Sequence, residues 1–365
     1  MRILTSAKYA LGVTAAVAVL AACSSGGGSQ IAPSGPSMGA SAIGRPAGYG
    51  QLKGQKSYMI AAKSNAHGAI KHFKQWMEPG AVKNRLLYVS DFSANIVQVY
   101  NYPSQGTQNP PAGTLTGFSN PQGLCTDRNN NVYVDNTGGE NVLEYPYGGT
   151  SATASWNDSG EYPVGCSIDP TDGTTLAISD IFSPTTGQGA VTICSNPSSC
   201  TTYVEPGGLL ECYFIGYMPN GDLYVDGIAS GTYGFGMAYL PHGSTTWQSA
   251  SVSGATISFP GAVQTDGTYL SVEDQSGSGG TTLYRCNASG ASLDCSVGTT
   301  VLGGTSDVVQ SYIKRGVKGV TGADNTSKVE STWQYPAGGS MRPNKTFTIN
   351  NGTYSTLIGN AVVLP

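Results

Sequence analysis

The apolar and polar positions of the chain alternate in short blocks, and the pattern is clearest over residues 121–149. Three blocks, at 124–127, 132–136 and 142–145, are rich in β-branched, aromatic and aliphatic residues, while Asn, Gly and Pro fill most of the gaps. Such blocks predict short strands joined by tight turns. One unit of this size cannot bury its own apolar faces, so it must pack against similar units.

Two sequence markers count the units. The first is a turn after the third strand of a unit, and it contains Pro103, Pro146, Pro241 or Pro336. The two long intervals between these prolines each fit two units, and the missing turns fall near residues 194–200 and 286–290. The second marker is a polar residue at the end of the second strand, which recurs at Asp91, Asn136, Asp180, Asp226, Asp274 and Asp324. Both markers count six units, and a period in the forties with four strands per unit predicts an all-β, six-bladed β-propeller of four-stranded blades.

The C-terminal segment is predicted to close this ring. Residues 357–364 resemble the opening strand of other units, such as residues 163–168, whereas no strand of that kind precedes Leu86. We therefore expect the C-terminal strand to be the innermost strand of the first blade, whose other three strands lie between Leu86 and about Gly117. Closure of this kind removes the exposed sheet edges at the two ends of the ring.

The recurring pattern Gly-x-Leu/Tyr-Val-x-Asp, followed by a Val-x-x-Tyr strand such as residues 142–145, is similar to NHL-type repeats. It also resembles the six-bladed propellers of the gluconolactonase and senescence-marker type. The resemblance covers residues 86–365 and implies the fold, while function has to be argued from a site.

The N-terminus has the features of an export signal. Arg2 and Lys8 precede an apolar stretch at residues 10–19, and residues 20–23, Leu-Ala-Ala-Cys, resemble the lipobox of bacterial lipoproteins. This resemblance implies that residues 1–22 are removed as a signal peptide, that Cys23 is lipidated, and that the protein is membrane-anchored in the bacterial cell envelope. Ser24 in place of Asp implies the outer membrane or cell surface. The alternatives are an ordinary secretory signal or a short apolar segment.

Two further segments precede the repeats. Residues 23–50 are mostly Gly, Ser, Pro and Ala, which predicts a flexible tether. Residues 51–85 concentrate Lys and Arg, and residues 69–77 are expected to form a short helix. This segment either contacts anionic lipid or cell-wall polymer, or packs its aromatic residues against the edge of the domain. The domain boundaries are therefore 1–22, 23–50, 51–85 and 86–365.

Charge and histidine content exclude some functions. The formal net charge is −4 and only 11% of residues are charged, so nothing in the repeat region attracts nucleic acid. The three histidines are His67 and His72, before the ring, and His242, in an outer turn. A Ser-His-Asp triad or a His-ligated zinc site therefore has no histidine near the axis.

One face of the predicted ring collects carboxylates near the axis. Hard cations such as calcium prefer oxygen ligands, and the resemblance to six-bladed lactonases implies a divalent metal that polarises a carbonyl group. Glu161 and Glu211 break the repeat, and with Asp180 they are the candidate metal ligands. The alternative is that the recurring Asp residues cap their own turns by accepting backbone N–H bonds.

The eight cysteines leave seven after Cys23 is lipidated, so at least one should be unpaired in an oxidising compartment. Cys194 and Cys200 flank one predicted hairpin turn, and Cys286 and Cys295 flank another, which predicts two local disulfides. We interpret Cys125, Cys166 and Cys212 as buried apolar positions and leave their pairing open.

These observations favour a lipid-anchored binding or scaffold protein of the cell envelope rather than an enzyme, and no catalytic residue is assigned. Its partners would be the membrane, through the lipid anchor, and a cell-wall, carbohydrate or protein ligand. The alternative is a metal-dependent hydrolase or lyase of a lactone or sugar-derived substrate. A purely structural envelope protein is the third interpretation.

Overall fold

The computed structural model describes residues 73–103, 109–183, 186–314, 319–340, 345–351 and 355–365. The predicted signal peptide, the predicted lipidation site Cys23, the predicted tether and residues 51–72 lie outside these ranges. In the described residues the fold is all-β, and the only helices are single 3₁₀ turns: η1 (Ala81–Lys83), η2 (Thr137–Gly139) and η3 (Pro206–Gly208). No helix in the described part of the chain is long and apolar enough to cross a membrane.

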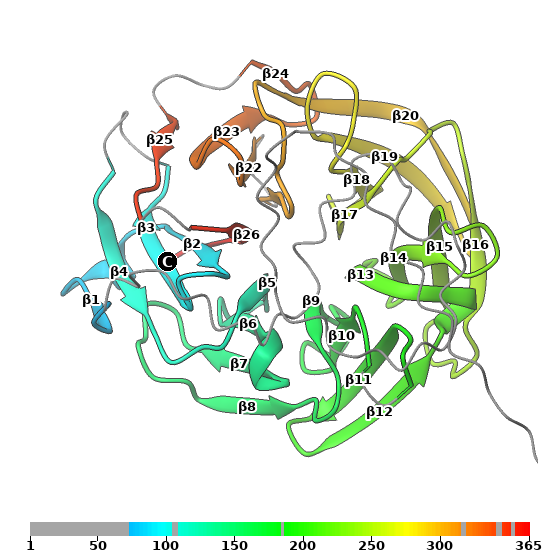
Figure 1. Cartoon of the computed structure of the whole chain (residues 1–365), viewed down its shortest axis with the longest axis horizontal. Coiled ribbons are helices and arrows are strands. Elements are labelled where there is room, and N and C mark those ends of the chain that lie inside the picture. Colours follow the sequence, from blue (N-terminus) through cyan, green and yellow to red (C-terminus); the bar gives the residue numbers. More distant parts are fainter. Residues whose placement is uncertain (1–72, 104–108, 184–185, 315–318, 341–344, 352–354) are drawn as a thin grey trace, which may run out of the picture. The chain divides into compact units, whose positions relative to one another are not determined.

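The described strands form five sheets (Figure 1). Three of them are antiparallel sheets of four or five strands. The first joins β26 (Leu357–Val363), β2 (Leu86–Asp91), β3 (Ile96–Asn101), β4 (Pro111–Leu115) and β1 (Trp76–Met77). The second contains β5 (Pro121–Thr126), β6 (Val132–Asn136), β7 (Asn141–Tyr145) and β8 (Ala154–Asn157). The third contains β9 (Pro163–Ile168), β10 (Leu176–Asp180), β11 (Ala190–Asn196) and β12 (Ser199–Val204).

The next sheet is larger because two antiparallel sets of four strands are joined at their outer strands. One set is β13 (Leu209–Tyr217), β14 (Leu223–Ala229), β15 (Phe235–Leu240) and β16 (Gln248–Ser253). The other is β17 (Pro260–Thr265), β18 (Leu270–Asp274), β19 (Thr282–Ser289) and β20 (Ser292–Gly303), and β16 pairs with β20 in parallel. The short strand β24 (Gly339–Ser340) also pairs with β20. The last sheet contains β21 (Tyr312–Ile313), β22 (Gly319–Asp324), β23 (Val329–Gln334) and β25 (Phe347–Thr348).

The innermost strands lie around a common centre, which makes the fold propeller-like (Figure 1). Neighbours in the cycle β26, β5, β9, β13, β17, β21 contact one another, and β21 contacts β26 in turn. The approach is close enough to require glycine: a Cβ at Gly123 would lie 2.3 Å from the Val164 carbonyl oxygen, and one at Gly359 would lie 2.3 Å from the Gln122 carbonyl oxygen. Glycine on the inner strands therefore lets neighbouring backbones pack together.

The C-terminal strand pairs as expected. β26 is antiparallel to β2, with Leu86 opposite Val363 and Val89 opposite Asn360. The first sheet thus combines residues from both ends of the described chain. Apolar clusters lie between neighbouring sheets, as where Tyr88 and Val97 meet Leu124 and Val134.

One expectation from the sequence is wrong. Residues 76–77 form strand β1, which pairs with β4, so the helix expected over 69–77 is absent from the described residues 73–77. Cys125 and Cys166, whose pairing the sequence left open, are buried and form a disulfide between β5 and β9, with Cα atoms 5.6 Å apart. The predicted disulfides Cys194–Cys200 and Cys286–Cys295 are confirmed. Among the described cysteines, Cys212 is free and buried.

Candidate functional site

A pocket of about 410 Å³ lies where the inner strands converge. Every inner strand contributes residues to its wall: β5 through residues 124–126, β9 through 166–168, β13 through 214–217, β17 through 262–265, β21 through 312–313, and β26 through Val362. The pocket lies at the end of the inner strands where β5 and β9 turn into β6 and β10. Its volume is in the range that holds a small molecule.

Lys314 is the notable charged residue of this pocket. It follows β21, has only 7% of its surface exposed, and donates from Nζ to the carbonyl oxygen of Val362 at 2.9 Å. Burial, and next the positive charge of Arg85, lowers the pKa of Lys314 from 10.5 to about 8. No carboxylate pairs with its ammonium group among the residues that the structure describes. Lys314 was not predicted as a site residue, because a lysine between two strand blocks is expected to be solvated.

The acidic residues of the pocket are bound to their own turns. Asp127 accepts hydrogen bonds from the backbone N–H groups of Asn129 and Asn131, at 2.9 and 2.8 Å. Asp169 accepts from the backbone N–H and hydroxyl of Thr171, at 2.8 and 2.7 Å. These carboxylates stabilise the turns at the rim of the pocket and are not directed at Lys314.

Side chains from different sheets hold the pocket wall in place. Gln310 accepts from the Leu124 N–H and donates to the Leu124 carbonyl, both at 3.0 Å. Gln264 donates to the Ser311 carbonyl at 3.0 Å and accepts from the Ile313 N–H at 2.8 Å. The disulfide between Cys125 and Cys166 also lines the pocket. The wall is therefore preorganised, because each inner strand is bonded to another sheet.

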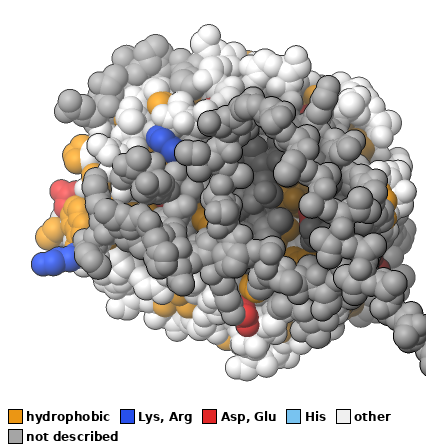
Figure 2. Space-filling view, viewed as in Figure 1, with side chains coloured by type: hydrophobic (Ala, Val, Ile, Leu, Met, Phe, Trp, Pro, Cys, Tyr) orange, Lys and Arg blue, Asp and Glu red, His pale blue; other side chains and the backbone are white. Residues whose placement is uncertain are grey.

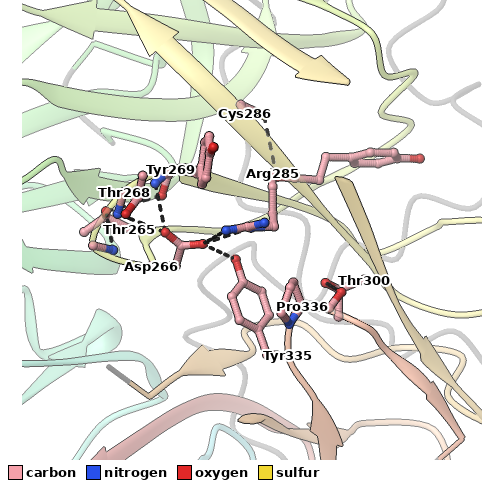
Figure 3. A network of polar contacts seen from close by, with 11 residues as sticks. Thr265, Asp266, Thr268, Tyr269, Arg285, Cys286, Thr300, Tyr335 and Pro336 are labelled. Carbon is pink, nitrogen blue, oxygen red and sulfur yellow. Dashed lines mark hydrogen bonds and ion pairs between the residues drawn. The ribbon is translucent and has the colours of Figure 1, made fainter. Parts of the chain in front are cut away.

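A polar network beside the pocket joins β17 and β19 to the residue after β23 (Figure 3). The Asp266 carboxylate pairs with the Arg285 guanidinium at 2.8 Å and accepts from the Tyr335 hydroxyl at 2.9 Å. The guanidinium carbon lies 4.4 Å from the ring centroid of Tyr269. Asp266 follows the pocket residue Thr265, so this network holds one edge of the pocket in place.

The opposite end of the inner strands contains most of the recurring carboxylates. Three of them are turn caps, as one of the two sequence interpretations proposed. Asp91 accepts from the N–H groups of Ala94 and Thr356, and Asp274 from those of Ser258, Phe259 and Ser276. Asp324 accepts from the N–H groups of Ser306, Thr326 and Ser327. Each of these carboxylates joins its own turn to the segment that leads into an inner strand.

Asp180 departs from this pattern. It is fully buried, its Oδ2 accepts from the Thr192 hydroxyl at 2.9 Å, and its Oδ1 has no hydrogen-bond partner. Burial, and next the Asp158 carboxyl, raises the pKa of Asp180 well above its usual value. Burial also raises the pKa of Asp158, and neither of its carboxylate oxygens has a hydrogen-bond partner among the described residues. Because both carboxyl groups are buried and each disfavours the charge of the other, ionising both at once is unfavourable.

Asp135 and Glu161 lie in the same acidic surroundings. Asp135 is fully buried, neither of its carboxylate oxygens has a partner, and burial followed by the Asp158 charge raises its pKa well above the usual value. Burial raises the pKa of Glu161 to about 7, and its Oε2 has no partner. We call Asp135, Asp158, Asp180 and Glu161 the acidic cluster.

The three candidate metal ligands are therefore only partly brought together. Asp180 and Glu161 belong to the acidic cluster, whereas the Glu211 carboxylate accepts from the Tyr213 hydroxyl at 3.0 Å. Asp158 was missed because it follows an outer strand, and only the packing of the second and third sheets brings it to Asp180. Among the described residues, no group of three or more His, Cys, Asp or Glu is arranged to hold a metal ion.

The described surface in the view of Figure 2 is mostly uncharged, with only a few Lys, Arg, Asp or Glu side chains near its edge. This agrees with the low charge of the sequence and places no basic stripe on that face of the described residues.

Comparison with known proteins gives the fold and no family. No family model matches the chain, and no curated protein matches it. A chain of the nidogen–laminin complex superimposes with a TM-score of 0.56 at 14% identity, covering 77% of this chain and 99% of its own. A 6-phosphogluconolactonase-like protein from Bacteroides fragilis has a TM-score of 0.48 at 16% identity, covering 78% and 85%. A protein of unknown function from Desulfotomaculum acetoxidans has a TM-score of 0.49 at 11% identity, covering 77% and 99%. At such identities the likeness concerns the fold alone.

Proposed function

We propose that this chain is a lipid-anchored binding protein of the bacterial cell envelope and that its ligand occupies the central pocket. The observation that carries the proposal is that all the inner strands line one preorganised pocket of about 410 Å³. A pocket with apolar surface and a few directed polar or charged groups is the usual form of a small-molecule site.

The proposal includes a six-bladed propeller. The inner strands β26, β5, β9, β13, β17 and β21 would each open one blade, and the large sheet would be two blades joined at β16 and β20. The parallel pairing of these outer strands is an addition to the ordinary blade, because blades normally contact one another through side chains.

The anchor is part of the same proposal. Lipidation at Cys23 would attach the chain to the outer membrane or cell surface, with residues 23–50 as its tether. Cys23→Ala should move the protein from the membrane fraction to the soluble fraction of the cell. A variant that stays with the membrane would contradict the lipid anchor.

Ligand binding is tested with a panel of cell-wall fragments, sugars and short peptides by ligand-observed NMR on the purified full-length chain. Leu364→Trp adds bulk at the pocket wall without altering a paired strand residue, so it should abolish binding of true pocket ligands. Val297→Trp, at an exposed position of β20, is the matched control and should bind normally. If no member of the panel binds, or if Leu364→Trp has no effect, the proposal is wrong.

One observation favours the second candidate, a metal-dependent hydrolase or lyase of a lactone or sugar-derived substrate. Asp180 and Glu161 share a buried cluster with carboxylate oxygens that no donor satisfies, and such oxygens suit a hard cation such as calcium. Stoichiometric metal in protein purified without chelator, lost in Glu161→Gln, would support this candidate. Equal metal content in the two proteins would argue against it.

A further inference from the structure

We propose that the ligand of the central pocket is a small organic anion and that its carboxylate or phosphoryl oxygens bind the ammonium group of Lys314. This inference rests on the proposed binding function and names the chemical class of the ligand.

Lys314 has unused hydrogen-bonding capacity. An ammonium group has three donors, and the described structure gives Nζ one acceptor, the carbonyl oxygen of Val362. The side chain is nevertheless almost fully buried, with 7% of its surface exposed. A buried ammonium group with spare donors is costly unless an acceptor with negative charge meets it.

The carboxylates of the pocket are hydrogen-bonded to their own turns. The Asp127 and Asp169 carboxylates are each occupied by at least two hydrogen-bond donors from their own turns. The positive charge of Arg85 acts on the Lys314 ammonium, and Arg128, which donates to the Asp172 carbonyl, is a second cation of the pocket lining. An incoming anion can therefore accept hydrogen bonds from Lys314 without displacing one of these carboxylates from its turn.

The size and the walls of the pocket suit an organic molecule. A volume of about 410 Å³ exceeds the needs of a bare inorganic ion, and Phe214, Ile215 and Val263 offer apolar surface beside the polar groups. These walls suit a molecule with a carbon skeleton as well as an acidic group. In such a low-dielectric site a charge-assisted hydrogen bond is stronger than at the surface.

The test is isothermal titration calorimetry at low ionic strength on the purified full-length chain. The probes are succinate, inorganic phosphate, and butane-1,4-diol as the uncharged counterpart of succinate. The variants are Lys314→Met, which removes the charge, and Lys314→Arg, which keeps it. Lys83→Met, at an exposed lysine of η1, is the control for the loss of a charge elsewhere.

We expect succinate or phosphate to bind the unmodified chain and Lys83→Met equally, with butane-1,4-diol binding neither. Lys314→Met should weaken anion binding by about 10- to 100-fold, as expected for the loss of a hydrogen bond to a charged group, while Lys314→Arg should retain most of it. Melting temperatures of the variants identify any that fail to fold.

Failure of this inference differs from failure of the proposed function. If neutral panel compounds bind in a way that Leu364→Trp abolishes and Lys314→Met does not change, the pocket binds ligands but the anion is wrong. If the anions bind equally to the unmodified chain and Lys314→Met, the inference is also overturned. If neither anions nor neutral compounds bind, both proposals fail.

Discussion

The two ends of the inner strands hold buried charge of opposite sign. The pocket end contains Lys314, whose ammonium group donates to one backbone carbonyl, and the other end contains the acidic cluster of Asp135, Asp158, Asp180 and Glu161. Elsewhere at both ends, carboxylates such as Asp127 and Asp91 are saturated by backbone N–H groups.

Some of these charged groups stabilise the fold, whereas others destabilise it. A carboxylate that accepts several N–H bonds stabilises a turn, because those donors would otherwise be buried without a partner. Lys314 and the acidic cluster have fewer partners than these caps, so they cost stability. Incompletely paired buried charges of this kind are concentrated at functional sites, and at the pocket end Lys314 lines the proposed binding site.

The largest expected effect comes from removing the strand that both ends share. A chain that stops at Thr356 lacks β26, which pairs with β2 and receives the Lys314 hydrogen bond at Val362. Loss of this strand should unfold the whole ring, because it exposes the edge of β2 and opens the cycle of inner strands. Circular dichroism and thermal melting would measure this, and a cooperative transition like that of the full chain would contradict it.

The disulfide at the pocket end should have the next largest effect. Replacing both Cys125 and Cys166 with Ala frees a loop closed over a sequence separation of 41 residues, which should lower the free energy of unfolding by about 3–4 kcal/mol. Chemical denaturation measures this loss. The disulfide between Cys194 and Cys200 closes a separation of only 6 residues, so replacing both with Ala should lower the free energy of unfolding by less. Equal losses of free energy in the two double variants would contradict the expectation that the disulfide between β5 and β9 stabilises the fold more.

The same substitution should have different effects on two recurring aspartates. Asp91→Asn replaces an acceptor that faces donors from Asn351, Ser355 and Thr356, so it should cost about 2 kcal/mol. Asp180→Asn can instead donate to Asp158 and removes a buried carboxyl whose pKa is raised, so its effect on stability should be more favourable at pH 8 than at pH 5. Unfolding curves of both variants at the two pH values test the distinction between cap and cluster. Similar losses in both variants would show that Asp180 is a cap as well.

The smallest expected effect is a difference in pH response between the ends. The pKa of Glu161 is raised from 4.5 to about 7, so its contribution to stability is complete below pH 4.5 and is lost as the pH rises through 7. The pKa of Lys314 is lowered from 10.5 to about 8, so its contribution is complete above pH 10.5 and is lost as the pH falls through 8. In the absence of ligand, Lys314→Met should therefore raise the free energy of unfolding by about 1 kcal/mol at pH 7 and by little at pH 10. Glu161→Gln should raise the free energy of unfolding by little at pH 5 and by more at pH 8. Thermal melting of both variants between pH 5 and pH 10 would show whether their gains in melting temperature change with pH in opposite directions.

Much of the fold was predictable because its signals are local. Blocks of apolar residues separated by Asn, Gly and Pro predict strands and turns wherever they occur, and the pairing of β26 with β2 followed from the similarity of residues 357–364 to other opening strands. The disulfide between Cys194 and Cys200 was predictable for the same reason, since the two residues flank one hairpin turn.

The wrong and missing predictions all depend on contacts between distant segments. Cys125 and Cys166 lie on different sheets, and nothing in their neighbouring residues indicates that their inner strands run side by side. The expected helix over residues 69–77 failed where it is described because the edge of β4 offers hydrogen bonds to Trp76 and Met77.

The sequence by itself determined the strands, the turns, the repeat and the local disulfides, because each depends on residues a few positions apart. Only the tertiary structure decided which charged groups are compensated. Asp91 and Asp180 occupy the same place in the repeat, yet one meets backbone N–H donors and the other meets Asp158. Lys314 is an ordinary lysine in the sequence and a buried cation in the fold, because burial and electric field depend on neighbours that only the closed ring brings together.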